Sequence, residues 1–531
     1  MAESGTPAFV RKASGLVREF SSASFLFYGI AVSGLFYGFF FIASVAPLIG
    51  GNVIIGMLLY LVAMIAVTVT YYVTVVIMPR SGGDYVFVSR ALHPSIGFIG
   101  NLTLAMLLIM LIGTTCVSIQ AFGFGILFGY LGVVLNNPSW YQLATTMSSP
   151  TWILGLSWIW IVLGGLVALG SVKFYVKIQN VIFIIMIVGY VAMLAALAAT
   201  SPANYAISFN NFVAQYKGAP GNYYNGVVTA AQGDGFVIPV QTAFSYASYL
   251  LFPLFAACGL MQWNAQLGGE IRNPKKTALL GLVGGGVIYV GLLAAGMLLL
   301  YHAVGFDFLS SLNYLLYNDY AKIPLPAYPY ANMLTAIATT PALGAFILVM
   351  AILQQFLYIP GVYLYVSRGL FAYSFDGLLP QWFAKVSPRT HGPVNAVLTS
   401  IVAALIFFVI VNIPQTASYI YLVGSIYTWI SSLIPTFMVG LSIVAIVKYK
   451  PNLLGLSPIK GIRLVALGVL TMFMMLAIVY AMLTDSVYGA NSPFSIALGI
   501  GIVVVIALVY IAAKIRGGPL LSLAFKEVPP A

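Results

Sequence analysis

Long apolar stretches recur from one end of the chain to the other, and short polar segments separate them. Each stretch runs for about 20 residues or more, the length that a helix needs to cross the hydrocarbon of a bilayer. We expect twelve such helices, at residues 25–48, 53–78, 95–133, 152–171, 177–199, 244–268, 278–302, 342–371, 394–412, 419–447, 463–484 and 494–514. The pattern therefore predicts an all-α integral membrane protein with 12 transmembrane helices.

The basic residues fall on one side of this predicted topology. Of the 22 Lys and Arg residues, 20 lie in the terminal segments and in alternate connections, and only Lys217 and Lys322 lie on the other side. The 20 are Arg11, Lys12, Arg18, Arg80, Arg90, Lys173, Lys177, Arg272, Lys275, Lys276, Arg368, Lys385, Arg389, Lys448, Lys450, Lys460, Arg463, Lys514, Arg516 and Lys526. Because basic loops stay in the cytoplasm, we expect both termini inside the cell and a multi-pass protein of the plasma membrane.

Composition agrees with this topology. Hydrophobic residues make up 61% of the chain and charged residues only 6%, which leaves no room for a soluble domain. A net charge of +12 would by itself allow binding to nucleic acid. Its distribution along one side of the spans predicts contact with the lipid bilayer and no nucleic acid.

Two parts of the chain have the same arrangement of spans. Residues 25–199 and 244–447 each hold five spans, and each part begins with a glycine-interrupted span. The first part enters the membrane from inside and the second from outside, which is the pattern of a five-plus-five inverted repeat. We expect the remaining segments to be a cytoplasmic segment at 1–24, an external loop at 200–243, two further helices within 448–514 and a cytoplasmic tail at 515–531. A second external segment contains "GFDFLSSLNYLLYN", which predicts a short helix.

Small residues interrupt two spans near their middle, in "GIAVSGLFYGFF" (29–40) and "FPLFAACGLMQWN" (252–264). A break in a membrane helix frees N–H and C=O groups, which are costly unless something polar pairs with them. The N–H groups at the start of a half-helix can hold a carboxylate, and the carbonyl groups at an end can hold an ammonium group. Two breaks therefore suit an amino acid, although close helix packing explains the small residues of either span alone.

Three segments on the predicted cytoplasmic side resemble those of amino acid permeases of the amino acid-polyamine-organocation (APC) superfamily. They are "MPRSGGDYVFVSRALHPSIGF" (78–98), "GGEIRNPKKTAL" (268–279) and "VSRGLFAYSFDGLLPQWFAKVSPRTHGPVNAVL" (366–398), in the order of the family. The resemblance implies the inverted-repeat fold of these permeases, alternating access, and an amino acid bound at the breaks of the first and sixth spans. By position, the residues that would bind it are Ala31, Val32, Ser33, Gly34, Leu35, Phe255, Ala256, Ala257, Cys258 and Gly259.

The same three segments carry charged residues that we expect at an inner gate. Glu270, Arg272 and Asp376, with Arg368, can form ion pairs that break and re-form in each cycle. Asp84 can pair with a nearby base or cap the helix that follows it. The alternative is a set of static surface pairs, worth less than about 1 kcal/mol each.

Related transporters carry either a lysine in the fifth span, which stands in for a bound cation, or hydroxyl groups on the eighth span, which bind sodium. Both features are missing here. The stretch 180–192 in the fifth span has no basic residue, and the stretch 344–366 in the eighth has no Ser or Thr. We therefore expect transport without sodium, although Gln354 or Gln355 can each offer one carbonyl oxygen. Proton coupling through Glu270, Asp84 or His93 stays open, as does simple exchange of one amino acid for another.

The residues left in the membrane interior are neutral. We expect Thr114, Thr115, Gln354 and Gln355 to line the site and Phe255 and Trp429 to act as aromatic gates, with hydrogen bonding and packing between helices as the alternative. Without an acid or a base in the interior, a charged substrate side chain would have no partner. The sequence therefore favours an amino acid with an uncharged side chain.

Other classes of protein fit the sequence less well. An enzyme in the membrane would need a cluster of His, Asp or Cys residues. Cys116 and Cys258 both fall in apolar spans, and we expect neither a metal site nor a cofactor. A channel would need a continuous polar stripe. The open alternatives are a transport-inactive sensor and a transporter of polyamines, organic amines or nucleobases.

Overall fold

The computed structural model describes residues 16–241, 244–412 and 419–517, and these residues are almost entirely helical. Ten helical segments among them are long and apolar enough to cross a membrane. They are α1 (Ser22–Ser33) with α2 (Leu35–Ile49), α3 (Val53–Ile77), α5 (Pro94–Val117) with α6 (Gly125–Val134), α8 (Pro150–Leu169), α9 (Val172–Ala199), α13 (Pro274–Ala278) with α14 (Gly285–Val304), α17 (Pro341–Phe375), α19 (Tyr419–Ser431) with α20 (Phe437–Tyr449), α21 (Ile462–Thr484) and α22 (Pro493–Gly517). The chain is therefore an all-α membrane protein.

Two shorter apolar helices, α12 (Tyr246–Ala256) and α18 (Val394–Asn412), stand where the sixth and ninth spans are expected. The 11 residues of α12 form a helix of about 16 Å, roughly half the thickness of the hydrocarbon. The chain then continues as a 3-10 helix, η2 (Gln262–Glu270). The sixth span is short because it is interrupted.

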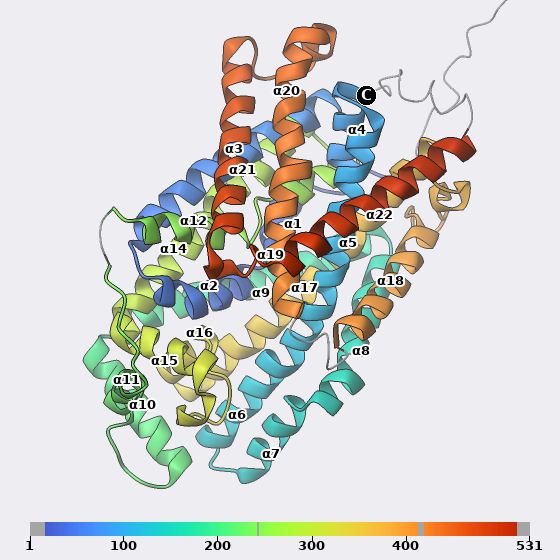
Figure 1. Cartoon of the computed structure of the whole chain (residues 1–531). Helices are drawn as coiled ribbons and strands as arrows, with labels where there is room; N and C mark the ends of the chain where they lie inside the picture. Colours follow the sequence, from blue (N-terminus) through green and yellow to red (C-terminus); the bar gives the residue numbers. More distant parts are fainter. Residues whose placement is uncertain (1–15, 242–243, 413–418, 518–531) are drawn as a thin grey trace, which may run out of the picture.

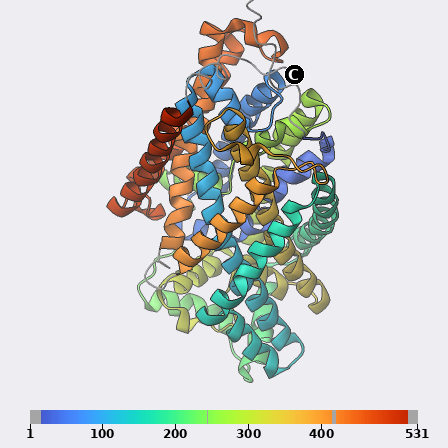
Figure 2. The ribbon, with the colours of Figure 1, turned by 90° about the vertical axis from the view of Figure 1, so that its right-hand side faces the viewer.

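Short helices gather at the two ends of the bundle (Figures 1 and 2). One end holds α7 (Pro138–Met147), α10 (Pro202–Lys217), α11 (Tyr223–Gly233), α15 (Phe306–Asn318) and α16 (Ala331–Ile337). The opposite end holds α4 (Gly83–Ala91) and the connection between α20 and α21. The short helix predicted from "GFDFLSSLNYLLYN" is confirmed as α15.

Segment 200–243, read from the sequence as a loop, contains the two helices α10 and α11. The segment is polar overall, but α10 has an apolar face. The buried residues of this face recur at helical spacing and are Tyr205, Phe209, Phe212 and Val213. The side chain of Ser201 accepts a hydrogen bond from the N–H of Asn204 and so caps the start of α10. A hydropathy window averages over such a face, whereas the spacing of its apolar residues would have revealed it.

The first span lies at the centre of the bundle. Within its most apolar stretch 78% of the residues are buried, against 22% for α22. The 35-residue helix α17 packs against α1, α2, α5, α8, α9 and α18. Helices α1, α2 and α17 therefore form the interior against which the peripheral spans pack.

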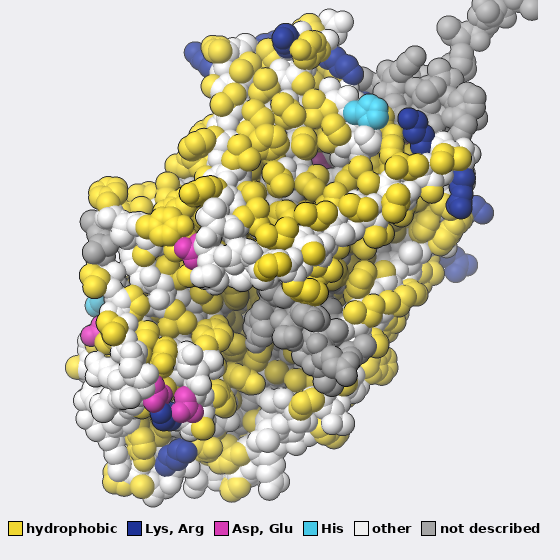
Figure 3. Space-filling view, viewed as in Figure 1, with side chains coloured by type: hydrophobic (Ala, Val, Ile, Leu, Met, Phe, Trp, Pro, Cys, Tyr) yellow, Lys and Arg dark blue, Asp and Glu magenta, His cyan; other side chains and the backbone are white. Residues whose placement is uncertain are grey.

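The surface shows the same division into an apolar middle and charged ends. In Figure 3 hydrophobic side chains cover most of the middle of the molecule, and Lys and Arg side chains gather mainly at the end that holds α4 and the α20–α21 connection. Acidic side chains on this face lie mainly toward the other end.

Candidate functional site

The first span is interrupted at one residue, Gly34. α1 ends at Ser33, Gly34 takes left-handed backbone angles (φ 72°, ψ 63°), and α2 begins at Leu35. Only glycine adopts such angles at little cost. The change of direction separates the C=O of Ser33 from the N–H of Tyr37, which would pair with each other in an unbroken helix.

Side chains from two other helices close this first break. The amide of Gln354, on α17, donates from Nε2 to the carbonyl oxygen of Ala31 at 3.2 Å and accepts from the N–H of Tyr37 at 3.0 Å. The hydroxyl of Tyr289, on α14, donates to the carbonyl oxygen of Ser33 at 3.2 Å. The separated groups of the first break thus both have partners, as a dry interior requires.

The second break, in the sixth span, extends over residues 257–261, between α12 and η2. Gly259 and Met261 both have positive φ angles, 98° and 56°. A Cβ atom on Gly259 would lie 1.8 Å from the ring of Trp263, so this position admits glycine alone. The second break is therefore wider than the first and its backbone departs further from a helix.

The second break is closed partly by a side chain that directly follows it in sequence. The side-chain oxygen of Gln262 accepts from the N–H of Leu260 at 2.9 Å. The hydroxyl of Tyr60, on α3, donates to the carbonyl oxygen of Gly259 at 2.6 Å. One neighbour in sequence and one neighbour in space thus satisfy two of the freed groups.

Glycines bring the two broken spans into contact. A Cβ atom on Gly38 would lie 2.9 Å from Sγ of Cys258, and one on Gly29 would lie 2.5 Å from Nδ2 of Asn264. Real side chains do not approach so closely, so these two glycines serve close packing. Gly34 is different, because it alone of the three has a positive φ. The small residues of the first span therefore divide between packing and breaking the helix.

The residues predicted to bind substrate, 31–35 and 255–259, lie along the two breaks and are mostly buried. Their side chains contribute little polarity. The hydroxyl of Ser33 donates back to the carbonyl oxygen of Gly29 at 2.7 Å, and the ring of Phe255 lies 6.3 Å from that of Tyr60. Any polar recognition here depends on backbone groups.

The other predicted lining residues are only partly brought together. Gln354 reaches the first break, whereas Thr114 and Thr115 both donate to the carbonyl oxygen of Leu111 on their own helix, at 2.9 Å and 2.8 Å. A Cβ atom on Gly499 of α22 would lie 2.5 Å from the ring of Trp429, which favours packing over gating for this residue. Gln355 is 2% exposed, and its Oε1 has no hydrogen-bond partner among the residues that the structure describes.

Charged side chains at the α4 end form a buried group that we call the inner cluster: Asp84, Arg90, Glu270, Arg368 and Asp376. Glu270 and Arg368 make a two-point ion pair, with Nε–Oε1 at 2.8 Å and Nη2–Oε2 at 2.9 Å, and their side chains are 0% and 1% exposed. Arg90 binds Asp376 through Nη1–Oδ2 at 2.8 Å and Nη2–Oδ1 at 3.0 Å. These are buried pairs and not the static surface pairs of the alternative reading.

Two details of the predicted gate differ from the structure. Asp376 pairs with Arg90, from the segment "SGGDYVFVSR", and not with Arg368, because Arg368 is already engaged at two points by Glu270. Arg272 lies outside the inner cluster, where its side chain is 63% exposed and 3.4 Å from Glu19.

Asp84 lies in the first turn of α4 and accepts a hydrogen bond of 2.5 Å from Nδ2 of Asn101. No basic side chain pairs with it in the described part of the chain, in contrast to one of the two predicted roles. Asn101 also contacts Gln266 of η2 at 3.1 Å and the hydroxyl of Tyr365 at 3.0 Å. Burial raises the pKa of Asp84 from 3.8 to about 6, against the opposing effect of the bond from Asn101.

Several residues that shape the site were not predicted from the sequence. They are Tyr60 and Tyr289, whose hydroxyls close the breaks, together with Gln262, Arg90 and Asn101. A tyrosine in the middle of a span was the available signal for the first two. The partners of Arg90 and Asn101 are up to 286 residues away in sequence, so no local pattern reveals them.

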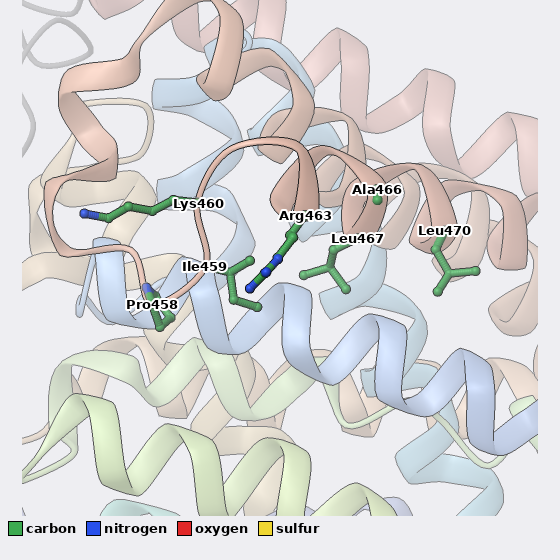
Figure 4. A pocket seen from close by; sticks show the side chains of 7 residues that line it. All are labelled: Pro458, Ile459, Lys460, Arg463, Ala466, Leu467 and Leu470. Atoms are coloured by element: carbon green, nitrogen blue, oxygen red, sulfur yellow. The ribbon is translucent and has the colours of Figure 1, made fainter.

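A groove on the surface lies away from both breaks. It has a volume of about 660 Å³ and is lined by Pro458, Ile459, Lys460, Arg463, Ala466, Leu467 and Leu470, at the start of α21 (Figure 4). A second groove of about 500 Å³ is lined by residues of α7 and the start of α8. Neither groove includes a residue of either break.

Paired helix breaks inside an apolar helical bundle are typical of a membrane transporter. The sequence model described as "Amino acid permease" matches residues 19–509, which is most of the chain. The chain therefore belongs to this family, within the APC superfamily. A comparison with curated proteins gives no significant match.

Proposed function

We propose that this permease carries amino acids with uncharged side chains across the plasma membrane by alternating access. The observation that carries the proposal is the contact between two interrupted spans in the buried centre of the bundle. Gly34 has no side chain to cap α2, and Gln354 takes only the N–H of Tyr37. The N–H groups of Leu35 and Phe36 in its first turn can therefore hold a substrate carboxylate.

The two tyrosines that close the breaks support an inverted repeat of residues 25–199 and 244–447. Tyr60 belongs to the second span of the first half and binds the break of the second half. Tyr289 belongs to the second span of the second half and binds the break of the first half. This exchange is what a two-fold axis in the membrane plane would produce, and it favours twelve spans in total.

The distribution of charge supports cytoplasmic termini. Basic side chains gather at the end that holds α4 (Figure 3). Of the two basic residues predicted outside, Lys322 forms ion pairs with Asp234 and Asp319, so its charge is neutralised locally. Under the positive-inside rule, the α4 end and the inner cluster face the cytoplasm.

The choice of an uncharged substrate side chain rests on the inner cluster. Glu270 and Arg368 are paired with each other, as are Arg90 and Asp376. An anionic substrate side chain would have to separate one of these buried pairs or stay unpaired, and both are costly. In this cluster the one acid that a cationic side chain could meet without separating a pair is Asp84, which Asn101 already holds.

A thermal-shift screen of the purified protein against amino acids, amines and nucleobases tests this proposal. Ligand binding to the folded state raises stability by RT ln(1 + [L]/Kd), so the ligand class appears without any assumption about a coupling ion. We expect stabilisation by alanine, leucine or phenylalanine, followed by uptake of the same compound into proteoliposomes. Stabilisation by arginine, glutamate, polyamines or nucleobases alone would contradict the proposed substrate, and binding without uptake would indicate a sensor.

A further inference from the structure

One neutral side chain joins the two halves of the first span. Gln354 is 0% exposed. Its amide spans the break, since Ala31 lies in the last turn of α1 and Tyr37 in the first turn of α2. The orientation of the amide is fixed by its partners, because a carbonyl oxygen requires the NH₂ group and an N–H requires the oxygen. One lone pair of the Gln354 oxygen is therefore used by Tyr37, and its NH₂ group lies on the carbonyl oxygen of Ala31, where a coordinated cation would otherwise be.

The chemistry of an amide suits this position, and it does so at every pH. It provides a donor and an acceptor on one rigid plane, so it satisfies a carbonyl group and an N–H group together without a net charge. Sodium or an ammonium group could satisfy Ala31 but not the N–H of Tyr37. A carboxylate could satisfy Tyr37 but would repel the carbonyl oxygen of Ala31.

The charged groups on the elements around Gln354 are Lys173 and Lys177 in the first two turns of α9, Asp84 and Arg90 of α4, and Arg368, 14 residues further along α17. Further titratable groups around Gln354 include phenols and a thiol. They are Tyr28 and Tyr37 of the first span, Tyr358 of α17, Tyr289 of α14, Tyr427 of α19 and Cys258 at the second break. The ion pair of Glu270 with Arg368 interacts electrostatically with Tyr28. Phenols and thiols carry no charge at neutral pH unless their surroundings favour the ion, and this surrounding is apolar and buried.

We propose that Gln354 is a built-in neutral ligand of the first break, so that the transport cycle needs neither a bound cation nor a proton at this point. This inference rests on the proposed transport function and specifies how it is coupled. The expected mode is exchange or facilitated movement of the substrate, with uptake that persists when sodium is replaced by choline at symmetric pH.

The substitution Gln354→Glu tests this assignment, because a protonated carboxyl group has the same shape and the same donor and acceptor as the amide. At low pH the variant should exchange substrate as the wild type does. As pH rises between 5 and 8, its rate relative to wild type should fall by about tenfold per pH unit once the carboxyl group ionises. The melting temperature of the variant relative to wild type should fall at lower pH, from about 4.3, the ordinary pKa of Glu, up to the pH at which the buried carboxyl group ionises, because over this range the folded state retains a proton that the unfolded chain releases.

The neighbouring Gln355→Glu variant is the matched control, since Gln355 is equally buried on the same helix. Its exchange relative to wild type should not follow the same tenfold fall per pH unit, because its amide does not bridge the break in this structure. Gln354→Leu should stay impaired at every pH. Equal exchange by Gln354→Leu and wild type, or a pH-independent ratio for Gln354→Glu, would overturn the inference. A wild-type protein that neither binds nor exchanges an amino acid would instead overturn the proposed function.

Discussion

The two breaks solve one problem, freed backbone groups in a dry interior, in different ways. The first interrupts its helix at Gly34 alone and is closed by side chains from distant helices, Gln354 and Tyr289. The second extends over five residues and has two positive φ angles, and the side chain of Gln262, which directly follows it, accepts one of its N–H groups. The first break therefore depends on how other helices are placed, whereas the second depends partly on its local sequence and partly on Tyr60 of α3.

Helix α17 touches both regions. Gln354 joins the first break, and Arg368, 14 residues and about 21 Å further along the helix, holds Glu270 at the end of the segment that follows the second break. A rigid helix that contacts both can link the conformation of one break to that of the other. The comparison therefore predicts large losses of stability where α17 holds η2, the segment after the second break, and small losses where a single hydroxyl group closes a break.

The largest effect is expected for Arg368→Met. The substitution leaves the carboxylate of Glu270 buried without its charged partner, which typically costs about 3–5 kcal/mol. Thermal unfolding in detergent measures the loss. Arg272→Met is the control, because this side chain is 63% exposed and its pair with Glu19 is long, so little should change. Similar losses of stability for the two variants would show that the buried pair of Arg368 and Glu270 does not anchor η2.

Alanine substitutions at the two glycines sharpen the comparison. Gly259→Ala places a Cβ atom 1.8 Å from the ring of Trp263 at a φ of +98°, whereas the nearest atom to a Cβ on Gly34, on Gln354, lies 3.5 Å away. Both variants incur about 1–2 kcal/mol of left-handed strain, and Gly259→Ala adds an overpacking cost of about 1–3 kcal/mol. Melting temperatures of the two purified variants test this order. A larger loss for Gly34→Ala would mean that the first break is the more constrained.

The sequence predicted more of the bundle than of the site. Hydropathy located ten of the twelve expected spans as helices long enough to cross a membrane, because about 20 apolar residues in a row have few other uses, and glycine placement located both breaks. The partners of the breaks could not be predicted, since Gln354 lies 317 residues from Tyr37 and hydropathy treats Tyr60 and Tyr289 as ordinary span residues. The pairing of Asp376 with Arg90 was missed for the same reason, because the choice between two arginines is made by tertiary packing.

A smaller, pH-dependent effect is expected at Asp84. Its hydrogen bond with Asn101 connects it to η2, because Asn101 also donates to Gln266. A folded-state pKa of about 6, above the ordinary 3.8, means that the folded protein retains a proton that the unfolded chain releases. The contribution of Asp84 to wild-type stability should therefore fall as pH rises from about 4 to about 6, by about 3 kcal/mol, and then level off.

The variant Asp84→Asn isolates this contribution, because it keeps the size of the side chain and removes its titration. The melting temperature of the variant minus that of wild type should increase from pH 4 to pH 6 and stay constant from pH 6 to pH 8. A difference that stays constant throughout would show that Asp84 has its ordinary pKa in the folded protein.

The smallest effects are expected for Tyr60→Phe and Tyr289→Phe, each of which removes one hydroxyl from a break and leaves the ring in place. Loss of a single hydrogen bond to a buried carbonyl group costs about 1 kcal/mol. The two losses should nevertheless differ, because the bond from Tyr60 to Gly259 is 2.6 Å long and that from Tyr289 to Ser33 is 3.2 Å long. Paired measurements of melting temperature and substrate exchange should show the larger loss of stability for Tyr60→Phe. They should show the larger change in exchange for Tyr289→Phe, since the first break has no local side chain to replace the missing donor. If both variants change both quantities equally, the two breaks are supported in the same way and the contrast between them is one of backbone shape alone.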